Sequence, residues 1–134
     1  MKGASSRIRA YQYSNHMREH GVEFSICPLL DTKYLDKLYE RKKYDFISIA
    51  RGFTNRLIDL ITSENYDLLW IESEMFPWCP FFLENAFAPA IPFLADYDDA
   101  IFHKYDIHPR WIVSRLLGRK IDKIMVNAAV VTAG

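Results

Sequence analysis

The sequence of 134 residues lacks the motifs of several common enzyme classes. It contains no G-x-G-x-x-G, which argues against a dinucleotide site, and no G-x-x-x-x-G-K-[ST], which argues against a P-loop nucleotidase. A serine nucleophile elbow is absent as well. The formal net charge is zero, with seventeen basic and seventeen acidic residues. The chain as a whole therefore has no electrostatic attraction to nucleic acid.

Cysteine is scarce and long apolar runs are missing. The two cysteines, Cys27 and Cys79, are far apart and have no metal-binding or redox spacing, which favours buried free thiols in a reducing compartment. No apolar run approaches the roughly 20 residues of a membrane-spanning helix. The first residues form no apolar signal segment. We therefore expect a cytoplasmic protein, with peripheral attachment to a membrane left open.

The composition itself is that of a globular domain. Half of the residues are hydrophobic, a quarter are charged, and 15% are aromatic. This length fits one domain and leaves no room for two full ones.

Apolar spacing predicts alternating helices and strands. Consecutive apolar residues, as in Leu68 to Ile71, indicate strands buried on both faces of a parallel sheet. The expected strands are residues 22–27, 67–73, 91–95 and 128–133. The expected helices are residues 5–20, 31–39, 44–64, 81–87 and 109–123, the last with a break at Gly118. This order predicts an α/β fold, an open parallel sheet with helices on both faces.

Both ends of the chain suggest an incomplete domain. Residues 3–6 resemble a turn that leads from a strand into a helix, but no strand precedes them. The chain stops at Gly134, where an apolar strand should pass into a loop.

Ligands of open α/β sheets bind beyond the carboxyl ends of the strands, and the first candidate site is the turn at residues 3–9. Free N–H groups at the start of the expected helix suit an anion. The candidate binding residues are Gly3, Ser5, Ser6, Arg7 and Arg9. An ordinary helix cap with solvated arginines is the alternative.

The second candidate site follows the strand at residues 67–73. Glu72 and Glu74 can accept hydrogen bonds from sugar hydroxyls, and an exposed Trp78 or Phe76 can stack on a sugar face. The alternative is that these aromatic side chains belong to the core.

The third candidate site is the acidic cluster after the strand at residues 91–95. Asp96, Asp98 and Asp99 repel one another, so they should bind a cation, meet basic groups or take part in proton transfer. An acidic helix cap is the alternative. His103 lies close by, but it has no metal-ligand spacing.

Several of these segments together resemble a known family. The most specific are Ser-Ser-Arg-x-Arg at residues 5–9 and Asp-Asp-Ala-Ile at residues 98–101. The others are residues 11–13, 21–24, 27–30, 66–74, 91–93 and 129–134. They resemble the opening of bacterial glycosyltransferases of family 4, retaining enzymes of the GT-B type.

The resemblance implies a Rossmann-like, acceptor-binding domain over residues 1–134, truncated at both ends. A donor-binding domain, absent here, would hold the nucleotide-sugar, so the chain alone should be inactive. The implied acceptor is a glycan or a lipid-linked sugar of cell-surface polysaccharide synthesis. No metal or other cofactor is implied, because helix dipoles and basic groups offset the charge of the leaving phosphate.

The resemblance also implies roles for single residues. Many relatives have a histidine after the strand that ends here near Ala95, and this chain has the acidic cluster instead. Asp98 and Asp99 would then be catalytic. Residues 3–7 would face the donor phosphates or the acceptor, and Glu72, Glu74 and Trp78 would shape the acceptor pocket. The full set of implied substrate-binding residues is Gly3, Ser5, Ser6, Arg7, Arg9, Glu72, Glu74, Trp78, Asp96 and His103.

The sequence leaves two alternatives to the GT-B interpretation open. In a metal-dependent GT-A enzyme, Asp96 and Asp98 would form the D-x-D motif. In a non-catalytic binding module of the same fold, the chain would bind a ligand without transfer. A strict requirement for manganese would favour the first alternative.

Overall fold

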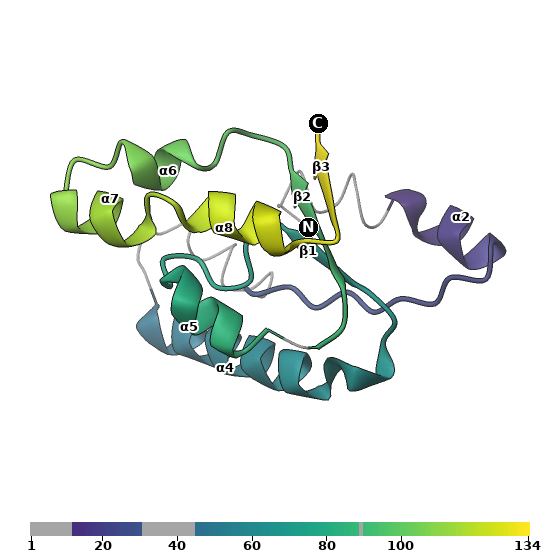
Figure 1. The fold of residues 1–134 in the computed structure, drawn as a ribbon. Helices are drawn as coiled ribbons and strands as arrows, with labels where there is room; N and C mark the ends of the chain where they lie inside the picture. Colours follow the sequence, from purple (N-terminus) through teal and green to yellow (C-terminus); the bar gives the residue numbers. More distant parts are fainter. Residues whose placement is uncertain (1–11, 31–44, 89) are drawn as a thin grey trace. The chain divides into compact units, whose positions relative to one another are not determined.

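The computed structural model describes residues 12–30, 45–88 and 90–134, and the chain has a mixed α/β architecture (Figure 1). It divides into two compact units, Met1–Asp59 and Leu60–Gly134. No helix of the described residues is both long and apolar enough to cross a membrane.

The first unit contains two described helices, α2 at Gln12–Glu19 and α4, which begins at Phe46 and ends at Ile61 in the second unit. Gly21 follows α2 with a φ of 78°, the left-handed conformation that glycine adopts after a helix. Asp45 caps α4, because its Oδ1 accepts hydrogen bonds from the amides of Ile47 and Ser48. Both helices lie within ranges that the apolar spacing predicts.

The strand expected at residues 22–27 is a wrong prediction. This segment pairs with no strand among the described residues, and the sheet contains three other strands. Alternating Val22, Phe24 and Ile26 are compatible with a strand, but a strand needs a partner for its backbone hydrogen bonds. The helix expected at residues 31–39 lies outside the described residues.

The second unit is built on a parallel sheet of three strands in the order β1-β2-β3. They are β1 at Leu69–Glu72, β2 at Phe93–Tyr97 and β3 at Val130–Ala133. In register, Glu72 lies beside Asp96, and Asp96 lies beside Thr132. The parallel strands confirm the α/β class. β3 is an edge strand whose residues are all exposed, so its expected burial is wrong.

Helices connect these strands. A 3-10 turn, η2 at Thr62–Asn65, precedes β1, and α5 at Phe81–Ala86 lies between β1 and β2. Three helices follow β2: α6 at His103–Asp106, α7 at Trp111–Leu117 and α8 at Lys120–Asn127. The expected break at Gly118 separates α7 from α8, whereas α6 is an element that the sequence pattern did not predict.

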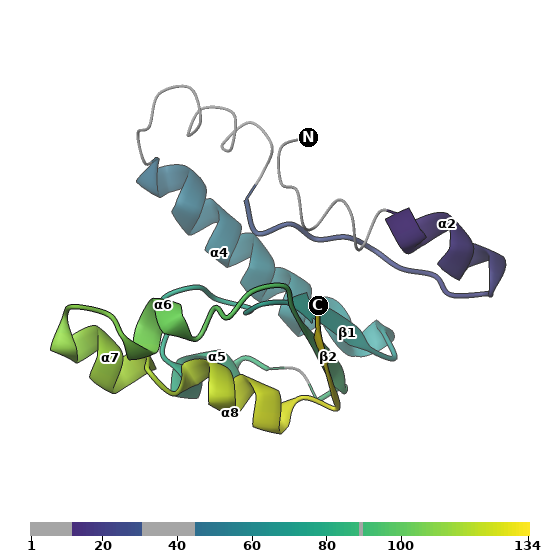
Figure 2. The same cartoon turned by 90° about the horizontal axis from the view of Figure 1, so that it is seen from above.

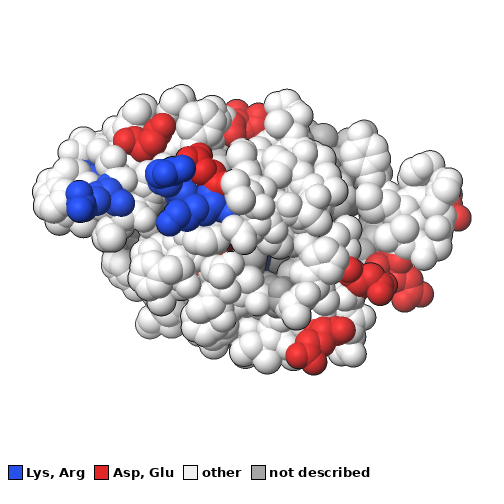
Figure 3. All heavy atoms as spheres, viewed as in Figure 1, with Lys and Arg blue, Asp and Glu red and all other residues white. Residues whose placement is uncertain are grey.

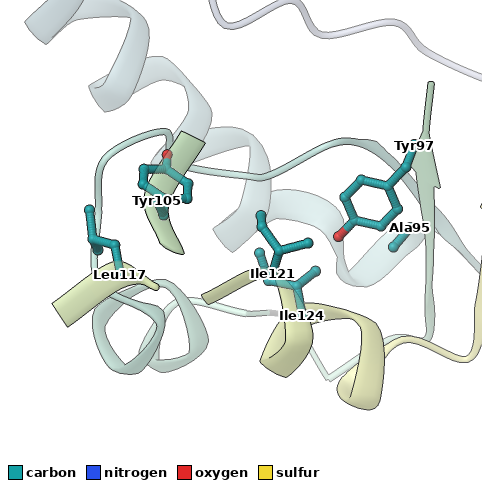
Figure 4. Packing of buried hydrophobic residues seen from close by; sticks show 6 residues of the cluster. All are labelled: Ala95, Tyr97, Tyr105, Leu117, Ile121 and Ile124. Atoms are coloured by element: carbon teal, nitrogen blue, oxygen red, sulfur yellow. The ribbon is translucent and has the colours of Figure 1, made fainter. Parts of the chain in front are cut away.

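The core of the second unit lies between β2 and helices α6 to α8. Ala95 and Tyr97 point from one face of β2, and the ring of Tyr97 extends toward Ile121 and Ile124 of α8 (Figure 4). Helices α5 to α8 lie together on this side of the sheet (Figure 2). The opposite face of β2 presents Asp96, which is buried as well.

Candidate functional site

A hollow of about 210 Å³ lies at the carboxyl ends of β2 and β3. The segment after β2 forms most of it, and the end of β3 and α8 complete it. Its lining residues are Tyr97, Asp98, Asp99, Ala100, Ile101, Phe102, Met125, Ala133 and Gly134.

The backbone fixes the acidic rim of this hollow. The amide of Gly134 donates to the carbonyl oxygen of Tyr97 at 2.9 Å, which holds the ends of the two strands together. The amide of Ile101 donates to the carbonyl oxygen of Asp99 at 2.7 Å and turns the chain toward α6. Asp98 is half-buried and Asp99 is exposed. Both carboxylates can accept hydrogen bonds from a ligand with hydroxyl groups, beside the apolar side chains of Ile101 and Phe102.

Asp96 belongs to the same acidic cluster but has different surroundings. It is only 2% exposed. Its Oδ1 accepts a hydrogen bond from Thr132 Oγ1 at 2.5 Å, and its Oδ2 accepts one from Trp70 Nε1 at 3.3 Å. Asp96 therefore links β2 to both neighbouring strands, and it is not among the residues that line the hollow.

The loop after β1 carries the second group of expected residues. Glu72 is half-buried at the end of the strand, and Ser73 has a φ of 69°. Glu74 turns inward, with 7% of its surface exposed. Its carboxylate accepts a hydrogen bond from the Tyr105 hydroxyl at 2.8 Å and one from Lys104 Nζ at 3.0 Å.

A buried lysine completes this network. Lys120 Nζ lies 2.6 Å from Glu74 Oε2 and 2.7 Å from Glu84 Oε2, and it also donates to the carbonyl oxygen of Phe76 at 2.6 Å. Burial raises the pKa of the Glu84 carboxyl, and the Lys120 ammonium acts in the opposite direction. The Lys120 ammonium thus binds the carboxylates of Glu74 and Glu84 and the backbone of the loop after β1. Glu74 therefore has a structural role in stabilising this loop.

Trp78 lies at the tip of the same loop with 52% of its surface exposed. Its φ of 64° is strained for a bulky residue. The amide of Trp78 donates to the Tyr105 hydroxyl at 3.0 Å, which fixes this conformation. Lys104 Nζ lies 5.0 Å from the centre of the indole ring, and the His108 ring lies 5.8 Å away. The indole is therefore a fixed and accessible aromatic surface, whereas Phe76 is buried.

Among the described residues, Glu72, Trp78 and His103 do not line the hollow. Gly3, Ser5, Ser6, Arg7 and Arg9 lie outside the described residues. His103 is exposed at the start of α6, with its Nδ1 3.2 Å from Asp106 Oδ1.

Both thiols are more accessible than expected. Cys27 is exposed and Cys79 is half-buried, so the prediction of two buried thiols is wrong. Partial burial still raises the pKa of each thiol.

The sequence analysis did not predict that Lys120, Glu84 and Tyr105 belong to the buried polar network around the loop after β1. A signal was present: Lys120 is spaced with Leu117 and Ile124 at helical intervals of three and four residues, on the apolar side of the helix. Glu84 lies in the same way within a helix of aromatic residues. A charged side chain that is buried needs a partner of opposite charge, so a buried glutamate indicates a nearby lysine or arginine.

Within residues 12–30, 45–88 and 90–134, no three histidine, cysteine, aspartate or glutamate side chains form a group that could hold a metal ion. Comparisons with models of protein families, with curated proteins and with solved structures found no match to this chain.

Proposed function

We propose that this chain is the acceptor-binding part of a glycosyltransferase, a Rossmann-like half of a GT-B enzyme. The observation that carries the proposal is the hollow at the carboxyl ends of β2 and β3, lined by Asp98 and Asp99. This edge is where open α/β sheets bind ligands. The residues around it, 96–102, are also among those that most resemble family 4 glycosyltransferases.

The acidic rim has a role in such a transfer. Asp98 or Asp99 orients the acceptor hydroxyl or accepts its proton, while the hydroxyl oxygen forms a bond to the anomeric carbon of the donor sugar. The bond from that carbon to the phosphate oxygen breaks, and the nucleoside diphosphate leaves. A donor-binding half would supply the nucleotide-sugar, and the acceptor is a glycan or a lipid-linked sugar. Trp78 offers a further aromatic surface for a sugar ring.

Binding of simple sugars tests the acceptor site directly. The chain is titrated with methyl α-glucoside, methyl α-mannoside and methyl α-galactoside while amide shifts are recorded by NMR. We expect at least one of them to shift the amides of residues 98–102. Replacing both carboxylates, as D98N/D99N, removes charge-assisted hydrogen bonds worth about 1.5–3 kcal/mol each, so affinity should fall about tenfold or more.

Asp67→Asn is the matched control. Asp67 is exposed just before β1, at the opposite end of the strands, so its substitution should leave sugar binding unchanged. Absence of shifts at residues 98–102 with all three glycosides, or equal binding by D98N/D99N, would contradict the proposal. In a chain that also carries a donor-binding half, unchanged turnover in both D98N and D99N would remove the acidic cluster from the mechanism.

A further inference from the structure

Helices α5 and α7 expose large apolar side chains on the surface of the second unit. On α7, the exposed fractions are 69% for Trp111, 54% for Ile112 and 60% for Leu116. Phe82 at the start of α5 is 67% exposed. Phe82 and Leu116 line one hollow of about 140 Å³, and Ile112 lies one helical turn before Leu116 on α7. These three side chains are therefore neighbours on one surface, and Trp111 begins the same helix.

Basic side chains border the same hollow. Arg115, Arg119 and Lys123 line it and are exposed. Lysine and arginine side chains gather over α7 and the first turn of α8 (Figure 3). Lys120 also lines the hollow, but its ammonium is bound to buried carboxylates. Asp122 is the acidic neighbour on α8 and lies 3.5 Å from Arg119.

The sequence places these groups on one side of the two helices. Ile112, Leu116, Arg119 and Lys123 follow one another at intervals of three and four residues, which corresponds to one face of a helix. Gly118 has helical angles, φ −56° and ψ −29°, but Arg119 has φ −108° and ψ 17°, so α7 and α8 are separate helices. Leu116 of α7, Arg119 between the helices and Lys123 of α8 nevertheless line the same hollow. The buried residues Leu117, Ile121 and Ile124 lie on the other side.

We propose that this surface of Phe82, Trp111, Ile112, Leu116, Arg115, Arg119 and Lys123 docks on an anionic phospholipid membrane. Tryptophan and aliphatic side chains flanked by arginine and lysine are the composition of helices that lie in a membrane interface. The basic side chains complement the negative headgroups. Nucleic acid would leave Ile112 and Leu116 in water, whereas a lipid surface buries them. This docking does not depend on the proposed sugar transfer.

Sedimentation with vesicles tests the docking. The chain is mixed with vesicles of pure phosphatidylcholine or of phosphatidylcholine with about 30% of the anionic phosphatidylglycerol, which gives the surface a negative potential. We expect sedimentation with the anionic vesicles and little with the neutral ones. R115Q/R119Q should weaken the binding at least tenfold, because each basic residue contributes to attraction by the anionic surface.

The matched control is R18Q/R51Q, which removes the same charge from two exposed arginines of the first unit. It should bind the anionic vesicles like the unchanged chain. Equal losses in the two double variants, or no sedimentation with anionic vesicles, would overturn the proposal.

A second variant separates lipid from nucleic acid. W111A/L116A removes apolar groups without changing the charge, and it should weaken vesicle binding about tenfold. Lipids with brominated acyl chains should quench tryptophan fluorescence of the unchanged chain and quench W111F much less. If W111A/L116A binds the vesicles fully and brominated lipids quench nothing, the surface is purely electrostatic, of the kind that binds nucleic acid, and the lipid proposal is wrong.

Discussion

At Lys120 one ammonium group compensates two buried carboxylates, those of Glu74 and Glu84. All three side chains are nearly or fully buried. Taking charges out of water is costly, and their mutual attraction offsets that cost only while each partner is present. The conformation of the loop from Glu74 to Trp78 therefore depends on a residue of a distant helix.

Replacing Lys120 tests this dependence. Lys120→Met has a side chain of similar length but leaves the buried Glu84 carboxylate without a cation and Glu74 with Lys104 alone, so the free energy of unfolding should fall by about 3–5 kcal/mol. The measurement is urea unfolding followed by tryptophan fluorescence, because Trp70, Trp78 and Trp111 are the three tryptophans of the chain and all lie in the second unit.

Lys123→Met is the control on the same helix. Lys123 is exposed, so its loss should change the free energy of unfolding by no more than about 0.5 kcal/mol. Adding Glu84→Gln to Lys120→Met should recover part of the stability, because one uncompensated charge is then removed. A Lys120→Met variant as stable as the Lys123→Met control would show that the carboxylates do not need this lysine.

Among the elements, those with a clear apolar pattern were predicted well. β1, β2 and α4 lie at or near the expected residues, and α7 and α8 meet at the expected Gly118. Burial was predicted less well: Phe46 and Ile47 of α4 are about four-fifths exposed. Apolar spacing shows which side chains share a face, but it does not show whether another element covers that face.

The close approach of α4 to residues 27–30 is a feature that no sequence pattern showed. Arg56 donates to the carbonyl oxygen of Cys27 at 2.9 Å. A Cβ atom at Gly52 would clash with the carbonyl oxygen of Leu29. Gly52 thus allows the helix to lie against this backbone within the first unit.

Gly52→Ala should therefore destabilise α4, although alanine is the better helix former by about 1 kcal/mol. We expect amide hydrogen exchange in residues 46–59 to speed up about tenfold or more, because the clash is with backbone that cannot rotate away. Asn55→Ala, at an exposed position of the same helix, should leave exchange unchanged or slow it. Slower exchange in Gly52→Ala would mean that the two backbones lie farther apart.

At the scale of the whole molecule, the sequence predicted where a hollow lies better than which acidic side chains line it. The rule that ligands bind at the carboxyl ends of strands leads to Asp98 and Asp99, which do line a hollow there. It cannot separate Asp96, whose carboxylate is bound to Trp70 and Thr132. The end of the strand decides this, because the strand was predicted to end at Ala95, two residues early, whereas Asp96 lies inside β2 and is paired with both neighbouring strands.

The buried tyrosines of the second unit make its stability depend on alkaline pH. Burial raises the pKa of Tyr97 and of Tyr105, and the nearby carboxylates of Glu74 and Glu84 act in the same direction. In the unfolded chain both phenols ionise near pH 10. The folded state therefore keeps protons that the unfolded state loses, so the stability is fully present below about pH 10 and decreases as the pH rises further.

Urea unfolding between pH 8 and pH 11.5, followed by tryptophan fluorescence, measures this decrease. Each tyrosine can contribute up to about 1.4 kcal/mol per pH unit, so Y97F/Y105F should lose stability less steeply above pH 10 than the unchanged chain.

The single variants should differ in their free energy of unfolding at pH 7. Tyr105→Phe removes the hydroxyl that joins Glu74 to the Trp78 amide and should cost about 1–3 kcal/mol. Tyr97→Phe removes a buried hydroxyl that has no hydrogen-bond partner in the described part of the chain, so it should be neutral or stabilising. Parallel pH curves for the unchanged chain and Y97F/Y105F would show that other groups cause the alkaline unfolding.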